Sequence, residues 1–115
     1  MKLALFAITL SAVVFVWPTQ AAPGGSTGRW EKLFFPVMQQ QMCGSPGHMV
    51  TLFKISPSAC RRTFRYAAKY CRRAAYQLPF YRVKGRATGQ VWGKWIGSCV
   101  GMAYDLKYTY KQPIP

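Results

Sequence analysis

The chain has 115 residues, and its sixteen lysines and arginines outnumber its two acidic residues, which gives a formal net charge of +14. This length is enough for one small domain, and a hydrophobic content of 50% excludes a disordered basic tail. So large a charge excess adds self-repulsion to the folded state and gives affinity for polyanions and anionic surfaces.

The first 21 residues are typical of a signal peptide. Lys2 provides a minimal positive region, and the apolar run Leu3–Trp17 is too short to cross a bilayer comfortably before Pro18 ends it. Small residues at Thr19 and Ala21 predict cleavage after Ala21, with a retained membrane anchor as the alternative. We therefore expect a soluble, exported protein, secreted to the extracellular space or, if bacterial, to the periplasm.

After the signal peptide at 1–21, the sequence predicts a flexible leader at 22–28, a single disulfide-stabilised domain at 29–110 and an extended tail at 111–115. Apolar residues recur at helical spacing over Arg29–Cys43, but Pro36 should start a new helical segment or kink the first. We expect a turn followed by a helix over Pro36–Cys43. The β-prone segment His48–Ile55 has no evident partner strand, so we expect extended chain packed against the helices.

The segment Pro57–Leu78 has the clearest helical pattern in the chain. Ser56 is a good N-cap, Pro57 suits the first helical position, and Pro79 stops the helix. One narrow stripe of this helix carries Cys60, Phe64, Ala67, Cys71, Ala74 and Leu78. The opposite side carries six cations: Arg61, Arg62, Arg65, Lys69, Arg72 and Arg73. We expect the first side to be buried and the second to face solvent.

Four cysteines in an exported chain predict two disulfides. Cys60 and Cys71 share a helix face but lie about 16 Å apart, which is beyond the reach of a disulfide. Each must therefore bond to a different partner. Cys43 lies just before Cys60, and Cys99 follows Cys71 across one loop, so the favoured pairs are Cys43–Cys60 and Cys71–Cys99, and the alternative is Cys43–Cys71 with Cys60–Cys99. The cysteine spacings lack the short chelating pairs of zinc sites, so we expect no metal.

Glycine recurs at every fourth residue from Gly85 to Gly101. As a helix, Gln90–Tyr108 would place Trp92, Ile96, Cys99, Ala103 and Leu106 on one stripe. The glycines would then let another helix approach closely, at about 1 kcal/mol each relative to alanine. The helix also brings Cys99 to Cys71, so we expect an all-α bundle of about three helices stapled by two disulfides. The alternative is an α+β fold with this segment as a hairpin.

Few residues in the mature chain are suited to catalysis. Glu31 beside Arg29 and Lys32, and Asp105 beside Lys107, are expected to form surface ion pairs. His48, the single histidine, is expected in a loop, and a Cys–His nucleophile would need an unpaired thiol. The chain has no phosphate-binding glycine loop, Gly-x-Ser-x-Gly elbow or His-Glu-x-x-His pattern. We expect neither an enzyme nor a cofactor.

The basic residues carry the functional signal. Solvated helices ordinarily mix both signs of charge, and the segment Pro57–Leu78 carries cations without acids. Arginine binds sulfate, phosphate or carboxylate through two parallel hydrogen bonds. The predicted polyanion-binding residues are Arg61, Arg62, Arg65, Lys69, Arg72, Arg73, Arg82, Lys84 and Arg86.

We expect a secreted, non-enzymatic basic protein that binds polyanionic extracellular material, such as anionic polysaccharide, acidic matrix protein or the matrix of a biomineral. The alternative is a cationic antimicrobial protein that makes peripheral contact with anionic microbial membranes. An exported location argues against a specific nucleic-acid partner. Tyrosines interleave with the cations, and we expect them to pack at the edge of the core with cation–π contacts.

Overall fold

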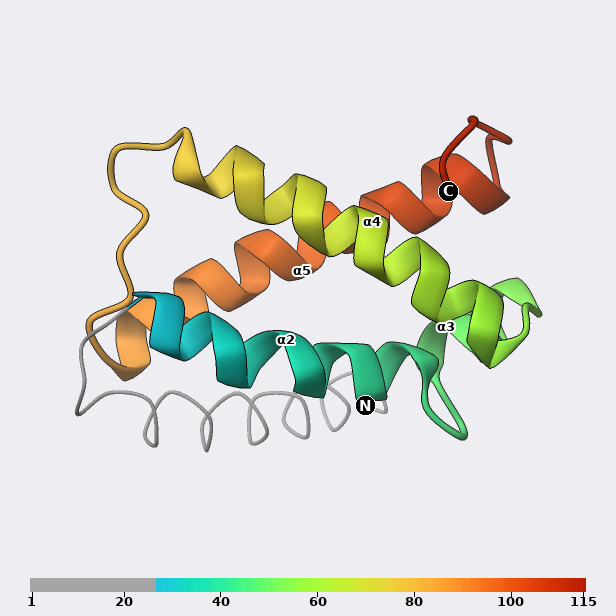
Figure 1. The fold of residues 1–115 in the computed structure, drawn as a ribbon, viewed down its shortest axis with the longest axis horizontal. Helices are drawn as coiled ribbons and strands as arrows, with labels where there is room; N and C mark the ends of the chain where they lie inside the picture. Colours follow the sequence, from blue (N-terminus) through green and yellow to red (C-terminus); the bar gives the residue numbers. More distant parts are fainter. Residues whose placement is uncertain (1–26) are drawn as a thin grey trace, which may run out of the picture.

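The computed structural model describes residues 27–115. Its helices, in chain order, are α2 (Thr27–Cys43), α3 (His48–Phe53), α4 (Pro57–Tyr76) and α5 (Arg86–Tyr108). The three long helices pack on one another, with α4 in contact with both α2 and α5, and residues 27–115 contain no strand (Figure 1). The predicted all-α bundle is confirmed, and the hairpin alternative is wrong. The predicted signal peptide lies outside the described residues, as does most of the predicted leader.

Helix α4 has the two faces that its sequence predicts. Its Ser56 cap accepts a hydrogen bond from the backbone N–H of Ala59 at 3.0 Å, and Pro57 occupies the first turn. The buried positions of the helix are Cys60, Thr63, Phe64, Ala67, Cys71 and Ala75. The helix ends at Tyr76, two residues earlier than expected, so Leu78 lies beyond it and is partly exposed.

Both favoured disulfides are confirmed. Cys43 at the end of α2 is bonded to Cys60 in the first turn of α4, with 5.5 Å between the Cα atoms. Cys71 of α4 is bonded to Cys99 in the middle of α5, with 5.9 Å between the Cα atoms. Helix α4 is therefore covalently fixed to both of the long helices against which it packs.

Helix α2 is continuous through Pro36, so the expected turn before this proline is wrong. A proline inside a helix removes one backbone hydrogen bond. The first turns of α2 bury Trp30 and Glu31 in the core, and these tertiary contacts hold the segment helical despite the proline. The helix also starts at Thr27, so the end of the predicted leader belongs to the domain.

Residues 48–53 form the short helix α3 and not extended chain. The backbone N–H of Thr51 bonds to the carbonyl of Gly47 at 3.0 Å, and Lys54 ends the helix in a left-handed conformation, at φ 55°. Val50 and Phe53 pack against the core from this turn. Burial of these apolar side chains outweighs the β-propensity of the segment. It also makes His48 the first residue of a helix, where a loop was expected.

Helix α5 starts at Arg86, four residues earlier than expected. At this end of the helix, Thr88 Oγ1 accepts hydrogen bonds from the backbone N–H groups of Lys84 and Gly85. The glycine spacing produces a close helix contact at Gly93, where an added Cβ would lie 3.2 Å from Phe34 of α2. Beyond α5, the tail turns back, and the carbonyl of Pro115 accepts hydrogen bonds from Thr63 and Lys107. None of the helices in residues 27–115 is long and apolar enough to cross a membrane.

Candidate functional site

The candidate site is the outer side of α4, here called the cationic face. All six of its members are exposed: Arg61, Arg62, Arg65, Lys69, Arg72 and Arg73. At 1.5 Å rise per residue, the row from Arg61 to Arg73 extends over about 18 Å. Because disulfides at Cys60 and Cys71 fix α4 near both ends of this row, the helix that carries the cations is held in place relative to α2 and α5.

Five of the six cations have no acidic partner among residues 27–115. The acids of this part of the chain are Glu31, which is buried in α2, and Asp105, which is exposed on α5. The five cations without a carboxylate are Arg61, Arg62, Arg65, Lys69 and Arg73. The positive field of this face is therefore uncompensated by the described residues, as the sequence suggests.

Arg72 differs from the other cations because it reaches back to α2. Its Nε donates a hydrogen bond to Oε1 of Glu31 at 2.7 Å, and its guanidinium lies 5.1 Å from the centre of the Tyr76 ring. The hydrogen bond to Glu31 raises the pKa of Arg72. About half of the side chain stays exposed, so Arg72 links the cationic face to the interior.

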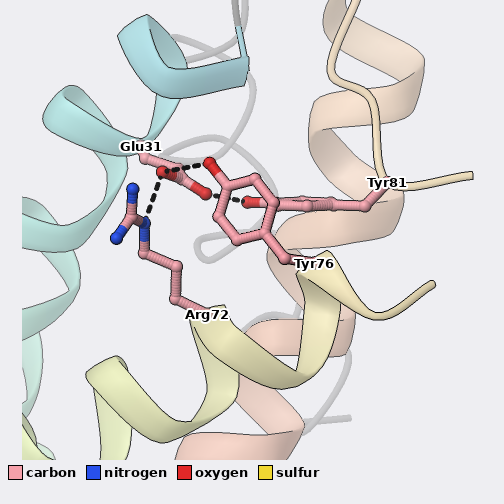
Figure 2. Close-up of polar contacts among 4 residues, drawn as sticks. All are labelled: Glu31, Arg72, Tyr76 and Tyr81. Carbon is pink, nitrogen blue, oxygen red and sulfur yellow. Dashed lines mark hydrogen bonds and ion pairs between the residues drawn. The ribbon is translucent and has the colours of Figure 1, made fainter. Parts of the chain in front are cut away.

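Glu31 is the centre of a polar cluster that joins three segments of the chain (Figure 2). Its carboxylate also accepts hydrogen bonds from the hydroxyls of Tyr76, at 3.2 Å, and Tyr81. Glu31 is 4% exposed and bonds to Arg72, so the expectation that it lies on the surface is wrong. Burial and the hydrogen bond to Glu31 raise the pKa of Tyr81.

One feature of the sequence could have indicated that Glu31 is buried, although the charges beside it predict a surface ion pair. Glu31 lies between the large apolar residues Trp30 and Leu33 at the start of a helix, and it is one of two acids in a strongly basic chain. An acid in this setting can be drawn into the core by partners distant in sequence. Those partners, Arg72, Tyr76 and Tyr81, lie 41 to 50 residues away.

The other three predicted cations lie outside α4. Arg82 and Lys84 are exposed in the connection between α4 and α5, and Arg86 is the first residue of α5 (Figure 1). Tyr81, which precedes Arg82, and Val83, which precedes Lys84, are buried in the core. The backbone N–H of Val83 also donates to Thr27 Oγ1 at 3.1 Å, which ties this connection to the start of α2. These cations therefore belong to a second element, beyond the end of the cationic face.

Tyrosines occupy two kinds of site. Tyr81 and Tyr104 are buried, and Tyr104 donates a hydrogen bond to the carbonyl of Cys60 at 2.7 Å. Tyr66 and Tyr70 are exposed on α4 and stack on each other, with ring centres 6.4 Å apart. The expected cation–π contacts are found at Tyr76, beside Arg72, and at Tyr108, beside Lys107. The stacked pair on α4 is available to a ligand beside the arginines.

Hollows of the surface are lined by residues of α2, α3 and the first turns of α4. A hollow of about 660 Å³ lies against α2 and α3, with Met38, Met42 and Met49 in its lining. A second hollow, of about 320 Å³, includes Arg61 and Gln40 in its lining. Within residues 27–115, all four cysteines are in disulfides and no three His, Cys, Asp or Glu side chains form a metal-binding group.

Comparison of the chain with protein-family models, curated protein sequences and solved structures finds no match. The feature that stands apart from ordinary packing is the cationic face, because its charges are concentrated, exposed and held on a fixed helix.

Proposed function

We propose that the chain is a secreted, non-enzymatic basic protein that binds polyanionic extracellular material through the cationic face of α4. The ligand class is anionic polysaccharide, acidic matrix protein or the organic matrix of a biomineral. These share closely spaced sulfate, carboxylate or phosphate groups. The observation that carries the proposal is the row of five exposed cations with no acidic partner in the described residues.

The construction of the face supports this function. Four of the five unpaired cations are arginines, whose planar guanidinium groups bind oxyanions through two parallel hydrogen bonds. The helix that carries them is fixed to α2 and α5 by disulfides, so binding requires little ordering of the backbone. Such binding releases counterions from the polyanion and weakens steeply as salt is added.

Two disulfides in a protein of this size are compatible with an extracellular location. Secretion is part of the proposal and depends on the predicted signal peptide. Amino-terminal sequencing of exported protein should begin at Ala22. Recovery of the intact amino terminus on a membrane-associated protein would contradict secretion, and it would instead support the membrane-anchor alternative.

A pair of assays tests the proposed ligand class. We expect the protein to stay on a sulfated polysaccharide column and to elute only at high salt, and to cause no dye leakage from anionic vesicles at micromolar concentration. The apolar face of α4 is buried and covalently fixed, so it is unavailable for insertion into lipid. Leakage without column retention would refute the proposal and favour the antimicrobial alternative. Retention that is insensitive to salt would contradict both.

A further inference from the structure

Helix α5 has an apolar stripe on its outer side, away from the core. Its members, with their exposed fractions, are Val91 at 62%, Trp95 at 37%, Met102 at 63% and Leu106 at 39%. Leu106 was expected on one stripe with Ile96 and Ala103, but those two are buried and Leu106 is exposed. At 100° per residue the four members fall within roughly 60° of arc. Trp95 makes an edge contact with the ring of Trp92 in the same helix, and the cationic face lies on another helix. The exposed part of the stripe would gain by leaving water.

The charged residues beside the stripe distinguish between possible occupants. Lys94 and Asp105 are both exposed, and the helical spacing places both on the same edge of the stripe. Their charges cancel, although the chain as a whole carries a net charge of +14. An anionic lipid surface would be attracted by cations along both edges of such a stripe. Lys94 and Asp105 are better suited to a partner whose acidic group lies opposite Lys94 and whose basic group lies opposite Asp105.

We propose that two copies of the chain associate through α5, as an antiparallel pair around a twofold axis near Ser98. In this register Val91 of one copy faces Leu106 of the other, and Trp95 faces Met102. The same operation brings Lys94 of each copy to Asp105 of the other, on the same side of the pair. A twofold contact requires a self-complementary surface, and this stripe meets that condition in both its apolar and its charged residues.

The small residues near the proposed axis support the contact. Ser98 of one copy would face Gly101 of the other along the edge that carries the charges. An added Cβ at Gly101 would meet nothing within 4 Å in its own chain, so the fold does not require a glycine there. Glycine in a helix interior costs about 1 kcal/mol relative to alanine. A glycine at this point would let the helix of the second copy approach closely, which would account for its presence.

The contact should be weak and reversible. Four partly exposed side chains per copy make a patch that is small beside the roughly 800 Å² per partner of a standard interface. We expect a dissociation constant on the order of 10–100 μM. The association is independent of the proposed function, but a dimer would present two cationic faces to one polyanion and so bind it with greater avidity.

Sedimentation equilibrium of the disulfide-bonded protein, over about 10 to 300 μM, tests the inference. We expect a monomer–dimer equilibrium that Met102→Lys abolishes. The single reversals Lys94→Asp and Asp105→Lys should each weaken the dimer about tenfold, because each replaces two attractions by two repulsions. The double reversal Lys94→Asp with Asp105→Lys should restore wild-type affinity. Lys69→Asp on α4 changes the net charge as Lys94→Asp does, and it should leave the dimer intact or tighten it.

Circular dichroism confirms that each variant is folded. A wild-type protein that stays monomeric throughout the range would overturn the inference. So would single reversals without effect, a double reversal without rescue, or loss of the dimer in the Lys69→Asp control. If Met102→Lys instead removed binding of a monomeric wild type to anionic vesicles, a lipid surface would be the occupant and the inference would be wrong. Column retention by the cationic face is measured separately, so these failures leave the proposed function standing.

Discussion

Arg72 in α4 and Glu31 in α2 form an ion pair, with 2.7 Å between Nε and Oε1. It joins the helix that carries the exposed cations to an acid buried in the neighbouring helix. One cation of α4 is thereby used inside the molecule, and the other five face outward. The pair adds a polar link between α2 and α4 to the covalent link at Cys43–Cys60.

Replacement of Glu31 should destabilise the fold more than replacement of Arg72. Glu31→Ala leaves the buried hydroxyl of Tyr81 without its acceptor and should lower the free energy of unfolding by about 2–3 kcal/mol. Arg72→Gln should cost about 1 kcal/mol or less, because half of that side chain is exposed to water. Denaturant unfolding of both variants measures the difference, and equal losses would contradict the greater contribution assigned to Glu31.

Stability should fall above about pH 10 because of two buried tyrosines. Burial raises the pKa of Tyr81 and of Tyr104 above the unfolded value near 10. Below pH 10 both tyrosines are protonated in the folded and in the unfolded chain, so the free energy of unfolding does not depend on their titration. At higher pH the unfolded chain loses these protons while the folded chain retains them. The free energy of unfolding should then decrease by up to about 1.4 kcal/mol per pH unit for each tyrosine. Denaturant titrations at successive pH values test the slope, which Tyr81→Phe should reduce.

Two glycines of α5 should respond differently to alanine. Gly101→Ala fills open space and gains helix propensity, so it should raise the stability of the monomer by about 1 kcal/mol. At Gly93 the new methyl would lie 3.2 Å from the Phe34 ring, so the same gain is offset by displacement of a core aromatic. Thermal unfolding at low protein concentration should therefore rank Gly101→Ala above Gly93→Ala, and the reverse order would contradict the packing of α2 on α5.

Both disulfides should contribute substantially to stability. They close segments of 17 and 28 residues, and loops of this length correspond to about 3–4 kcal/mol each when chain entropy dominates. We expect the double variant Cys71→Ala with Cys99→Ala to unfold at lower denaturant, and Cys43→Ala with Cys60→Ala to behave similarly. A change below about 1 kcal/mol in either would contradict the role of the bonds as staples for so small a core.

The parts of the fold that depend on local pattern could be predicted from the sequence. The cap at Ser56 and most of the buried stripe of α4 follow from local pattern and helical spacing, although Ala74 is only half-buried. Reach excludes a Cys60–Cys71 bond, and order along the chain favours the two pairs that the structure contains. Helix α3 could not be predicted in this way, because one and a half turns of apolar sequence fit an extended segment equally well. Packing of Val50 and Phe53 against the core selects the helical conformation of this segment.

The cationic residues could be read from the sequence, but not their intramolecular partners. Arg72 resembles its neighbours in the sequence pattern and differs from them because Glu31 is buried within reach. Glu31 in turn is held by Tyr76 and Tyr81, which are distant in the chain and brought together by the end of α4 and the following connection. The charges next to Glu31 in the sequence favour an ion pair on the surface. The contacts with residues distant in the chain instead hold Glu31 in the interior.

We expect the outer side of α4, and not the net charge alone, to bind the polyanion. The triple variant Arg62→Gln, Arg65→Gln and Lys69→Gln removes three charges from the cationic face. The control variant Lys32→Gln, Lys54→Asn and Lys111→Asn removes three charges from elsewhere in the chain.

Elution of both variants from a sulfated polysaccharide column, across a salt gradient, compares them directly. We expect the α4 variant to elute at much lower salt than wild type and to show a shallower dependence of affinity on salt, whereas the control should elute close to wild type. Equal displacement of the two variants would show that binding follows net charge alone, and it would contradict the assignment of the site to α4.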